Sequence, residues 1–292
     1  MRRRIIILLL LILIPAISFA EIIKKIVKNP DGTKQIFFYS EGKEIAKEIL
    51  GKDNNVIKTI GKIPDGIVKE YYENGKLKVE QNFKNGKQEG IFKEYYESGK
   101  LKTEGNYKND GLEGILKEYY ENEALKGVWN FKDGKQEGIG KRYYKSGKLL
   151  IEGNFKDGKP EGISKRYYKS GKLWIEGNYK DGKPEGIVKH YHENSELKSE
   201  GNYKDGKLEG ISKRYYESSK LKAEENYKNN ILEGVTKHYY EDGGIKLIET
   251  YKDGKRTNRK EYDEKGKLKF EQDYPELKKK KSFLEKVLEL LR

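Results

Sequence analysis

The sequence of 292 residues contains no cysteine, only six prolines and only three histidines. The lack of cysteine excludes disulfides, thiolate metal sites and cysteine nucleophiles. Apolar residues make up only 34% of the chain, close to the level at which chains stay unfolded. Aromatic residues nevertheless reach 12% and recur at fixed places, which is not expected of a disordered chain. We therefore expect a folded protein with a thin core and no catalytic cysteine.

The longest apolar run, Ile5–Ile14, lies close to the amino terminus and follows Arg2, Arg3 and Arg4. Pro15 ends the run, and small residues follow up to Ala20. This three-part pattern is typical of a secretory signal peptide. An uncleaved membrane anchor is the alternative, but a span takes roughly 20 apolar residues. The pattern predicts cleavage after Ala20 and a periplasmic, cell-surface or secreted protein.

The chain is basic, with a formal net charge of +14. The part after residue 20 keeps 59 basic and 48 acidic residues, a net charge of +11. Such a balance attracts anionic lipid, acidic glycans and phosphate. The charges alternate in sign along most of the chain, however, which is typical of a solvated face. Anionic lipid and glycan therefore stay open as partners, whereas export argues against nucleic acid.

A 24-residue pattern repeats through most of the chain. Each copy opens with a glycine, at Gly66, Gly90, Gly114, Gly138, Gly162, Gly186, Gly210 and Gly234. A fixed period of this size indicates a repeat array, in which each unit contacts mainly its neighbours. An array presents a long repetitive surface, which favours a binding scaffold over an enzyme with one asymmetric pocket.

We number repeat positions from the opening glycine as position 0. Position 1 is Ile or Val, position 5 is Tyr, position 11 is Leu or Ile, and position 17 is always aromatic. Alternation of this kind, in β-branched and aromatic residues, predicts strands. We expect positions 1, 5, 11, 13 and 17 to share the buried face, and positions 6, 12 and 14 to share the solvated one. Lys at position 3 falls on the expected buried face, where it has no evident role.

Two turns separate the strands of each repeat. Lys145–Lys148, with the sequence K-S-G-K, is an example of one turn. Lys156–Lys159, with Asp157-Gly158 at its centre, is an example of the other. Asp-Gly between alternating runs is a strong hairpin signal. The sequence therefore predicts an all-β fold, a single-layer antiparallel meander of 24-residue hairpins.

Glu176–Gly186 reads E-G-N-Y-K-D-G-K-P-E-G and resembles the MORN repeat, whose pattern is roughly Y-x-G-x-W/F-x-N/D-G-K-x-H-G. The usual His is replaced by Glu, as at Glu137, Glu161 and Glu185. The longer unit resembles a bacterial variant often labelled as the antitoxin of a toxin–antitoxin pair. The resemblance covers about residues 60–275. It implies a single-layer sheet that serves as an attachment surface for proteins or membranes.

The pattern divides the chain into five parts: a signal peptide over 1–20, a degenerate cap over 21–60, eight repeats over 61–257, a shortened ninth repeat over 258–275, and a basic segment with an amphipathic helix over 276–292. The helix begins with Ser282–Glu285, a capping box, and carries Phe283, Leu284 and Leu288 on one side. We expect it to cover the last strand edge; docking on a membrane or a partner is the alternative.

Motifs for chemistry are weak. Gly153–Lys159 matches G-x-x-x-x-G-K, but Pro160 follows where a phosphate loop needs Ser or Thr and a helix. His190 and His192 could hold a metal or serve a hydrolase, yet sister copies place Arg166 and Tyr168 there. We therefore expect no enzyme, cofactor or metal.

Tyrosine next to Lys-Arg pairs suggests a stacking surface. The candidate binding residues are Tyr96, Tyr120, Tyr144, Tyr168, Tyr216, Arg142, Arg166 and Arg214. The sequence thus favours an exported, non-enzymatic scaffold that binds a protein or surface partner through Tyr, Lys and Glu. The alternative is an antitoxin or immunity protein that neutralises a partner toxin.

Overall fold

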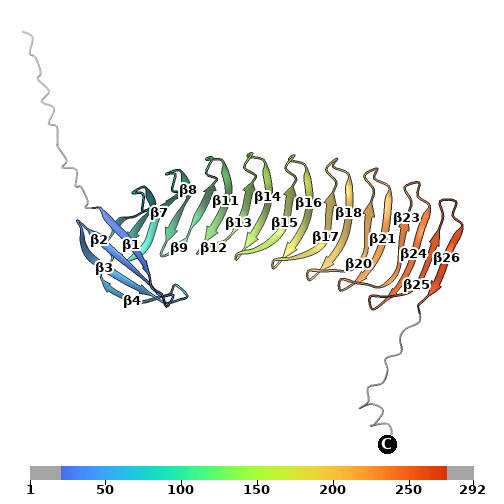
Figure 1. Cartoon of the computed structure of the whole chain (residues 1–292), viewed down its shortest axis with the longest axis horizontal. Coiled ribbons are helices and arrows are strands. Elements are labelled where there is room, and N and C mark those ends of the chain that lie inside the picture. The colour runs from blue at the N-terminus through green and yellow to red at the C-terminus, as the bar shows by residue number, and fades with distance from the viewer. Residues whose placement is uncertain (1–20, 275–292) are drawn as a thin grey trace, which may run out of the picture. The chain divides into compact units, whose positions relative to one another are not determined.

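The computed structural model describes residues 21–274, and every regular element within them is a β-strand (Figure 1). The predicted all-β fold of repeated hairpins is confirmed. The signal peptide and the helix expected after Ser282 lie outside the described residues. The chain forms two compact units, which meet in sequence at Gly99 and Lys100.

The first unit contains seven described strands. They are β1 (Ile22–Lys28), β2 (Lys34–Ser40), β3 (Lys43–Leu50), β4 (Val56–Gly61), β5 (Gly66–Tyr71), β6 (Leu77–Lys84) and β7 (Lys87–Tyr95). Strand β1 pairs antiparallel with β2 but parallel with β5. The degenerate segment before the repeats is therefore joined to the first repeat by a parallel contact, which an antiparallel meander does not include.

Most of the fully buried apolar side chains lie in this first unit. Phe38 is 1% exposed and meets Phe83 edge-on, with 6.1 Å between the ring centroids. Ile22, Ala46, Ile63 and Val68 complete the cluster. The degenerate segment thus supplies apolar residues that cover the beginning of the array, as expected of a cap.

The second unit is a series of hairpins, β8 to β26, which Figure 1 shows side by side in chain order. Its strands are β8 (Leu101–Lys108), β9 (Gly111–Leu112), β10 (Gly114–Tyr119), β11 (Leu125–Lys132), β12 (Lys135–Gln136), β13 (Gly138–Tyr143), β14 (Leu149–Lys156), β15 (Lys159–Tyr167), β16 (Leu173–Lys180), β17 (Lys183–Tyr191), β18 (Leu197–Lys204), β19 (Lys207–Leu208), β20 (Gly210–Tyr215), β21 (Leu221–Lys228), β22 (Ile231–Leu232), β23 (Gly234–Tyr239), β24 (Ile245–Lys252), β25 (Lys255–Tyr262) and β26 (Leu268–Asp273). Among its described residues only Val188 and Ala223 are fully buried apolar side chains, in keeping with the expected thin core.

The Asp-Gly turns form as predicted. Lys156 pairs with Lys159 around Asp157 and Gly158, whose φ angles are +50° and +80°. Two central residues with positive φ make a type I′ turn, whose twist matches that of the strands. Asn109-Asp110 and Asn229-Asn230 adopt the same positive angles, since Asn and Asp tolerate this region.

The expected buried face is wrong for the first strand: positions 1, 3 and 5 lie on the face opposite to positions 13, 15 and 17, and position 1 is exposed. Ile139 and Ile163 are 60% and 65% exposed, whereas Val188 at position 2 is 7% exposed. Position 2 pairs with position 15 of the same repeat, as Gly140 pairs with Gly153. The first strand therefore contributes its even positions to the buried face, and the second strand contributes positions 13, 15 and 17.

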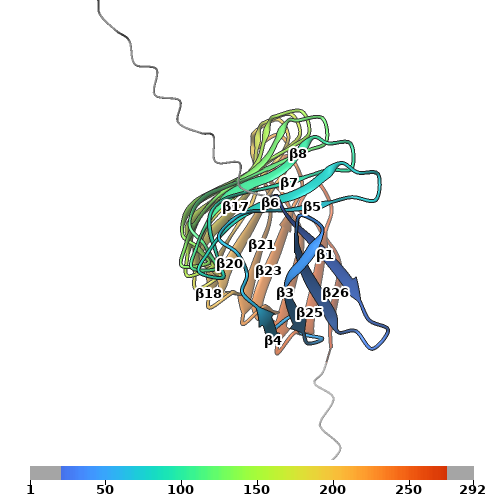
Figure 2. The ribbon, with the colours of Figure 1, turned by 90° about the vertical axis from the view of Figure 1, so that its left-hand side faces the viewer.

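The reason is the hairpin register. Arg142 pairs with Ile151, but Tyr143 pairs with Leu149, so Leu150 at position 12 is an extra residue in a β-bulge. The same shift recurs between positions 4 and 5 of the other repeats, for example at Arg166 and Tyr167. A bulge bends the strand and re-aims the residues beyond it, and Figure 2 shows these strands bending along their length.

Candidate functional site

The register gives each repeat two chemically different faces. The ladder face carries positions 1, 3, 5, 14 and 16, and the core face carries positions 2, 4, 13, 15 and 17. Cross-strand pairs define them: Ile139 pairs with Asn154 and Lys141 with Glu152 on the ladder face, whereas Arg142 pairs with Ile151 on the core face. The Lys at position 3, unexplained by the sequence, therefore faces a carboxylate.

The ladder face exposes a row of aliphatic side chains at position 1. In the second unit these are Ile115, Ile139, Ile163, Ile187, Ile211 and Val235, between 49% and 65% exposed. A single exposed Ile is ordinary, but here an exposed aliphatic side chain recurs in every copy, with Asn at position 16 between one copy and the next. Sequence reasoning missed this row because it placed position 1 in the core.

Beside the isoleucine row, Lys, Glu and Tyr form a repeated polar network. The Tyr167 hydroxyl donates to Glu152 Oε1 at 2.8 Å, and Lys141 Nζ lies 3.4 Å from Glu152 Oε2. Tyr191 donates in the same way to Glu176, at 2.6 Å. Burial, and then the hydrogen bond to the carboxylate, raises the pKa of Tyr119, Tyr167, Tyr191 and Tyr215 to about 12. The network fixes the charged groups and balances their charge.

The predicted binding tyrosines at position 6 lie elsewhere, at the end of the hairpin. The Tyr144 hydroxyl donates to the carbonyl oxygen of Tyr167 at 2.7 Å, and Tyr168 donates likewise to Tyr191. Tyr120 and Tyr216 make the equivalent bond at 2.8 and 2.7 Å. These hydroxyls connect one repeat to the next, so only their ring surfaces remain for a ligand.

The predicted binding arginines occupy position 4 on the core face, away from the position-6 tyrosines. Arg214 pairs with Glu225 at position 15. In the part of the chain that the structure describes, no hydrogen bond or ion pair joins the guanidinium group of Arg142 or Arg166 to another residue. The stacking surface predicted from Tyr and Arg together is thus divided between two places, and its role in binding stays a prediction.

His190 and His192 have different surroundings. His192 occupies position 6 and its Nε2 lies 3.3 Å from the carbonyl oxygen of Tyr215, in the place of the usual Tyr hydroxyl. His190 lies on the core face beside Ile175 and Ser199, where burial and the nearby Lys198 lower its pKa. Residues 21–274 hold no group of three or more His, Asp and Glu arranged around a metal.

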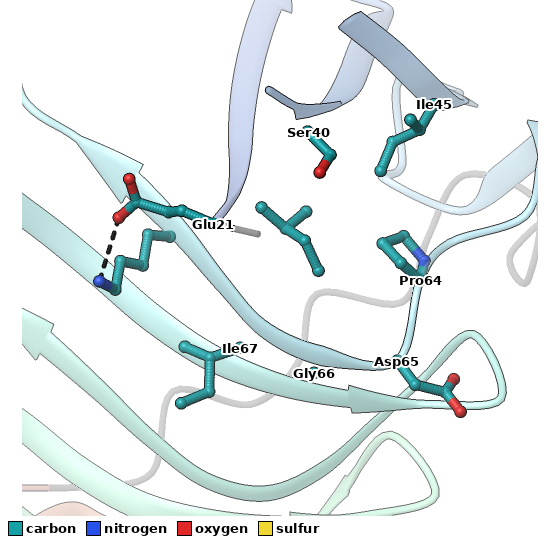
Figure 3. A pocket seen from close by; sticks show the side chains of 9 residues that line it. Glu21, Ser40, Ile45, Pro64, Asp65, Gly66 and Ile67 are labelled. Carbon is teal, nitrogen blue, oxygen red and sulfur yellow. Dashed lines mark ion pairs between the residues drawn. The ribbon is translucent and has the colours of Figure 1, made fainter. Parts of the chain in front are cut away.

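The first unit contains a hollow, a cavity of about 650 Å³ (Figure 3). Ile22, Ile45, Pro64 and Ile67 line it. On one side the Lys69 ammonium lies 3.0 Å from Glu21 Oε1, and Tyr71 donates to the same carboxylate at 2.5 Å. Glu21 and Lys69 at this hollow are therefore already paired with each other, and Asp65 accepts a hydrogen bond from the backbone N–H of Asn85 at 2.7 Å.

Comparison with known proteins agrees with this geometry. A family described as MORN repeat variant matches residues 64–85, 88–109, 112–133, 136–157, 160–181, 184–205, 208–229, 232–253 and 258–274. The chain belongs to the MORN repeat variant family. No curated protein matches it.

Solved structures add little to the assignment. One titled "Crystal Structure of TcdB2-TccC3-Cdc42" is 12% identical to this MORN repeat variant protein, with a TM-score of 0.18. The match covers 83% of this chain, which spans 16% of the length of that chain. At that TM-score the similarity supports no conclusion about fold or function. Residues 21–274 include no helix long and apolar enough to span a membrane.

The Glu that replaces the usual MORN His has a structural role in these repeats. Glu137 Oε2 accepts a hydrogen bond from the backbone N–H of Asp157 at 3.1 Å, and Glu161 accepts one from Asp181 at 3.0 Å. Each acceptor precedes an opening glycine, and each donor lies in an Asp-Gly turn further along the chain. A carboxylate accepts such bonds more strongly than a neutral group does, so the substitution strengthens the edge formed by the turns.

Proposed function

We propose that this protein is a non-enzymatic attachment scaffold whose ladder face binds a protein partner. The observation that carries the proposal is the exposed row at position 1, with Ile115, Ile139 and Ile163 between 56% and 65% exposed. These side chains contribute little to the core, so folding alone does not account for Ile or Val in every copy. Lys and Glu beside them balance each other's charge, which favours a protein surface over a polyanion.

The test removes the apolar row without disturbing the fold. The triple substitution Ile139→Ser, Ile163→Ser, Ile187→Ser removes three neighbouring side chains. The control substitutes Ser for Lys156, Lys180 and Lys204, which are exposed at position 18. Proteins retained from an extract of the source cells are identified by mass spectrometry, and their affinities are measured with purified components.

Burial of an Ile side chain contributes about 1.5–3 kcal/mol. We therefore expect a directly binding partner to lose more than about tenfold in affinity for the Ile variant, while the Lys variant keeps its affinity. If every partner binds the two variants equally well, the ladder face is not the binding surface.

We also propose that the protein works outside the cytosol, based on the pattern of Arg2 to Ala20. Amino-terminal sequencing of the protein from its source cells should find Glu21 as the first residue. Full-length protein that begins at Met1 in the cytosolic fraction would contradict this.

A further inference from the structure

A depression lies on the core face where three small residues form a row across β13, β14 and β15. Gly140 pairs with Gly153, and Gly153 pairs with Ser164. The next row towards the bulge is Arg142, Ile151 and Arg166, paired in the same order. Because neither glycine has a side chain, this row leaves space that neighbouring side chains border.

Aromatic rings border this depression. Trp129 occupies position 15, where other copies hold Gly, Gln or Glu. A Cβ on Gly140 would lie 2.5 Å from the Trp129 ring, so the glycine permits the ring to lie there. Phe155 meets Trp129 edge-on at 5.9 Å. Together with Tyr179 they line a cavity of about 200 Å³, to which Arg142 and Arg166 also contribute.

The neighbouring repeats fill the equivalent space with their own side chains. A Cβ on Gly177 would lie 2.9 Å from Val188, and one on Gly201 would lie 2.7 Å from Leu208. One repeat further on, the carboxylate of Glu225 occupies position 15 and is 7% exposed. A Cβ on Gly153 would meet the smaller Ser164 side chain, with its Oγ at 3.1 Å. The space beside Gly153 is therefore filled less than in those repeats.

The arginines beside this cavity also differ from those of later repeats in their charge partners. Where position 15 is Glu, the nearby arginines are neutralised: Arg214 pairs with Glu225, and Arg256 lies 2.7 Å from Glu249. Beside Arg142 and Arg166, position 15 is Trp129 and Gly153, and within residues 21–274 neither guanidinium has an acidic partner. The two cations thus lie at an apolar cavity without a counter-charge.

We propose that this cavity binds a small aromatic carboxylate. The ring lies against Trp129 and Phe155, and the carboxylate accepts hydrogen bonds from Arg142 and Arg166. An engineered apolar cavity of about 150 Å³ is known to hold a benzene ring, so a ring of this size fits. The two arginine backbones are two strand spacings apart, about 10 Å, and their long side chains reach a shared anion. Arg and carboxylate form strong, often bidentate pairs. The site is independent of the ladder face, which lies on the opposite side of the same strands.

Benzoate is the probe, and benzyl alcohol is its neutral counterpart. The chain has two tryptophans, so Trp174→Phe leaves Trp129 as the fluorescent reporter in the cavity. We expect benzoate to change Trp129 fluorescence with saturation, and benzyl alcohol to bind at least tenfold more weakly. No saturable change with benzoate, or equal binding of the alcohol, would overturn the proposal.

The double variant Arg142→Gln, Arg166→Gln separates binding from folding. Its matched control is Lys141→Gln, Lys165→Gln, which removes the same charge from the same two strands on the ladder face. Circular dichroism establishes that both variants fold. We expect the Arg variant to lose at least tenfold in benzoate affinity and the Lys variant to lose less than twofold. Equal losses in the two variants would show that net charge, not this site, attracts the ligand.

Discussion

Adjacent tyrosines in each repeat have different roles at the scale of the single residue. Tyr167 at position 5 donates to the Glu152 carboxylate on the ladder face. Tyr168 at position 6 donates instead to the backbone of Tyr191 in the next repeat. The two side chains diverge because successive residues of an extended backbone point to opposite sides. One tyrosine therefore organises charge, and the other joins repeats.

The joining role predicts a cost for removing one hydroxyl. Tyr144→Phe leaves the carbonyl of Tyr167 without its partner, and should lower the free energy of unfolding by about 1 kcal/mol. Tyr143→Phe is the control, because position 14 facing Tyr143 is Val128 and the described chain offers its hydroxyl no hydrogen bond. Urea unfolding of both variants measures the difference. Equal costs would contradict the assigned role.

The charge-organising tyrosines predict a dependence on alkaline pH. The pKa of Tyr167 is about 12 in the folded chain and about 10 when unfolded. The contribution of these tyrosines to stability is therefore fully present below pH ~10 and is lost as the pH rises towards ~12. An absorbance titration of tyrosinate should show Tyr119, Tyr167, Tyr191 and Tyr215 ionising at a higher pH than the other tyrosines. Unfolding in urea should return the pKa of these four residues to about 10.

Glu152→Gln checks the cause of this shift. The variant removes the hydrogen bond to a carboxylate but not the burial, which is the larger cause. The pKa of Tyr167 should fall without returning to 10. A pKa that does not change would assign the shift to burial alone.

At the scale of the element, the two turns of each repeat set where the strands pair. Both central residues of the Asp-Gly turn, such as Asp157 and Gly158, have positive φ. The backbone N–H of Asp157 donates a hydrogen bond to Glu137, which is the residue before the opening glycine. The other turn closes on a glycine such as Gly147, whose N–H donates to Tyr144. The bulge at position 12 lies next to this second turn, so turn and bulge together decide which side chains are buried.

A substitution at Gly158 isolates the requirement for positive φ. No atom lies within 4 Å of a Cβ built at this residue, so Gly158→Ala adds backbone strain without a clash. We expect a loss of about 1–2 kcal/mol, measured by urea unfolding. Gly158→Asn should recover part of the loss, since Asn tolerates this conformation. An Asn variant less stable than the Ala variant would contradict this explanation.

At the scale of the whole molecule, the second unit is a row of hairpins in which each repeat contacts mainly its neighbours. The Tyr hydroxyls at position 6 and the Glu carboxylates before the opening glycines make the same contacts in copy after copy. Stability in such an array is close to a sum over units and their interfaces. A complete 24-residue repeat can therefore be removed or added without changing the contacts between the remaining repeats.

Deleting residues 162–185 removes one complete repeat and joins Glu161 to Gly186, which restores the pattern. We expect this variant to fold with its strand signal intact in circular dichroism and with a modest loss of stability. Deleting only residues 162–173 removes half a hairpin, which reverses the direction of every later strand. That variant should aggregate or lose its cooperative unfolding, and equal behaviour of the two deletions would contradict a modular array.

The sequence by itself determined the period, the strands and the turns of this protein. Those features are local: a type I′ turn needs Asp157-Gly158 or a similar pair, and β-branched and aromatic residues favour extended backbone. It also indicated that His192 takes the place of a repeated Tyr, which its contact with Tyr215 confirms.

Only the tertiary structure decided which side of each strand faces the core. Alternation along one strand shows which of its residues share a face. Which face of one strand continues the buried face of the next depends on how the two strands pair, and one bulged residue reverses that assignment. Ile139 was therefore placed in the core by its sequence and on the surface by its pairing with Asn154. For the same reason the cavity beside Gly153, built from residues of β11, β13, β14, β15 and β16, has no signature in any single repeat.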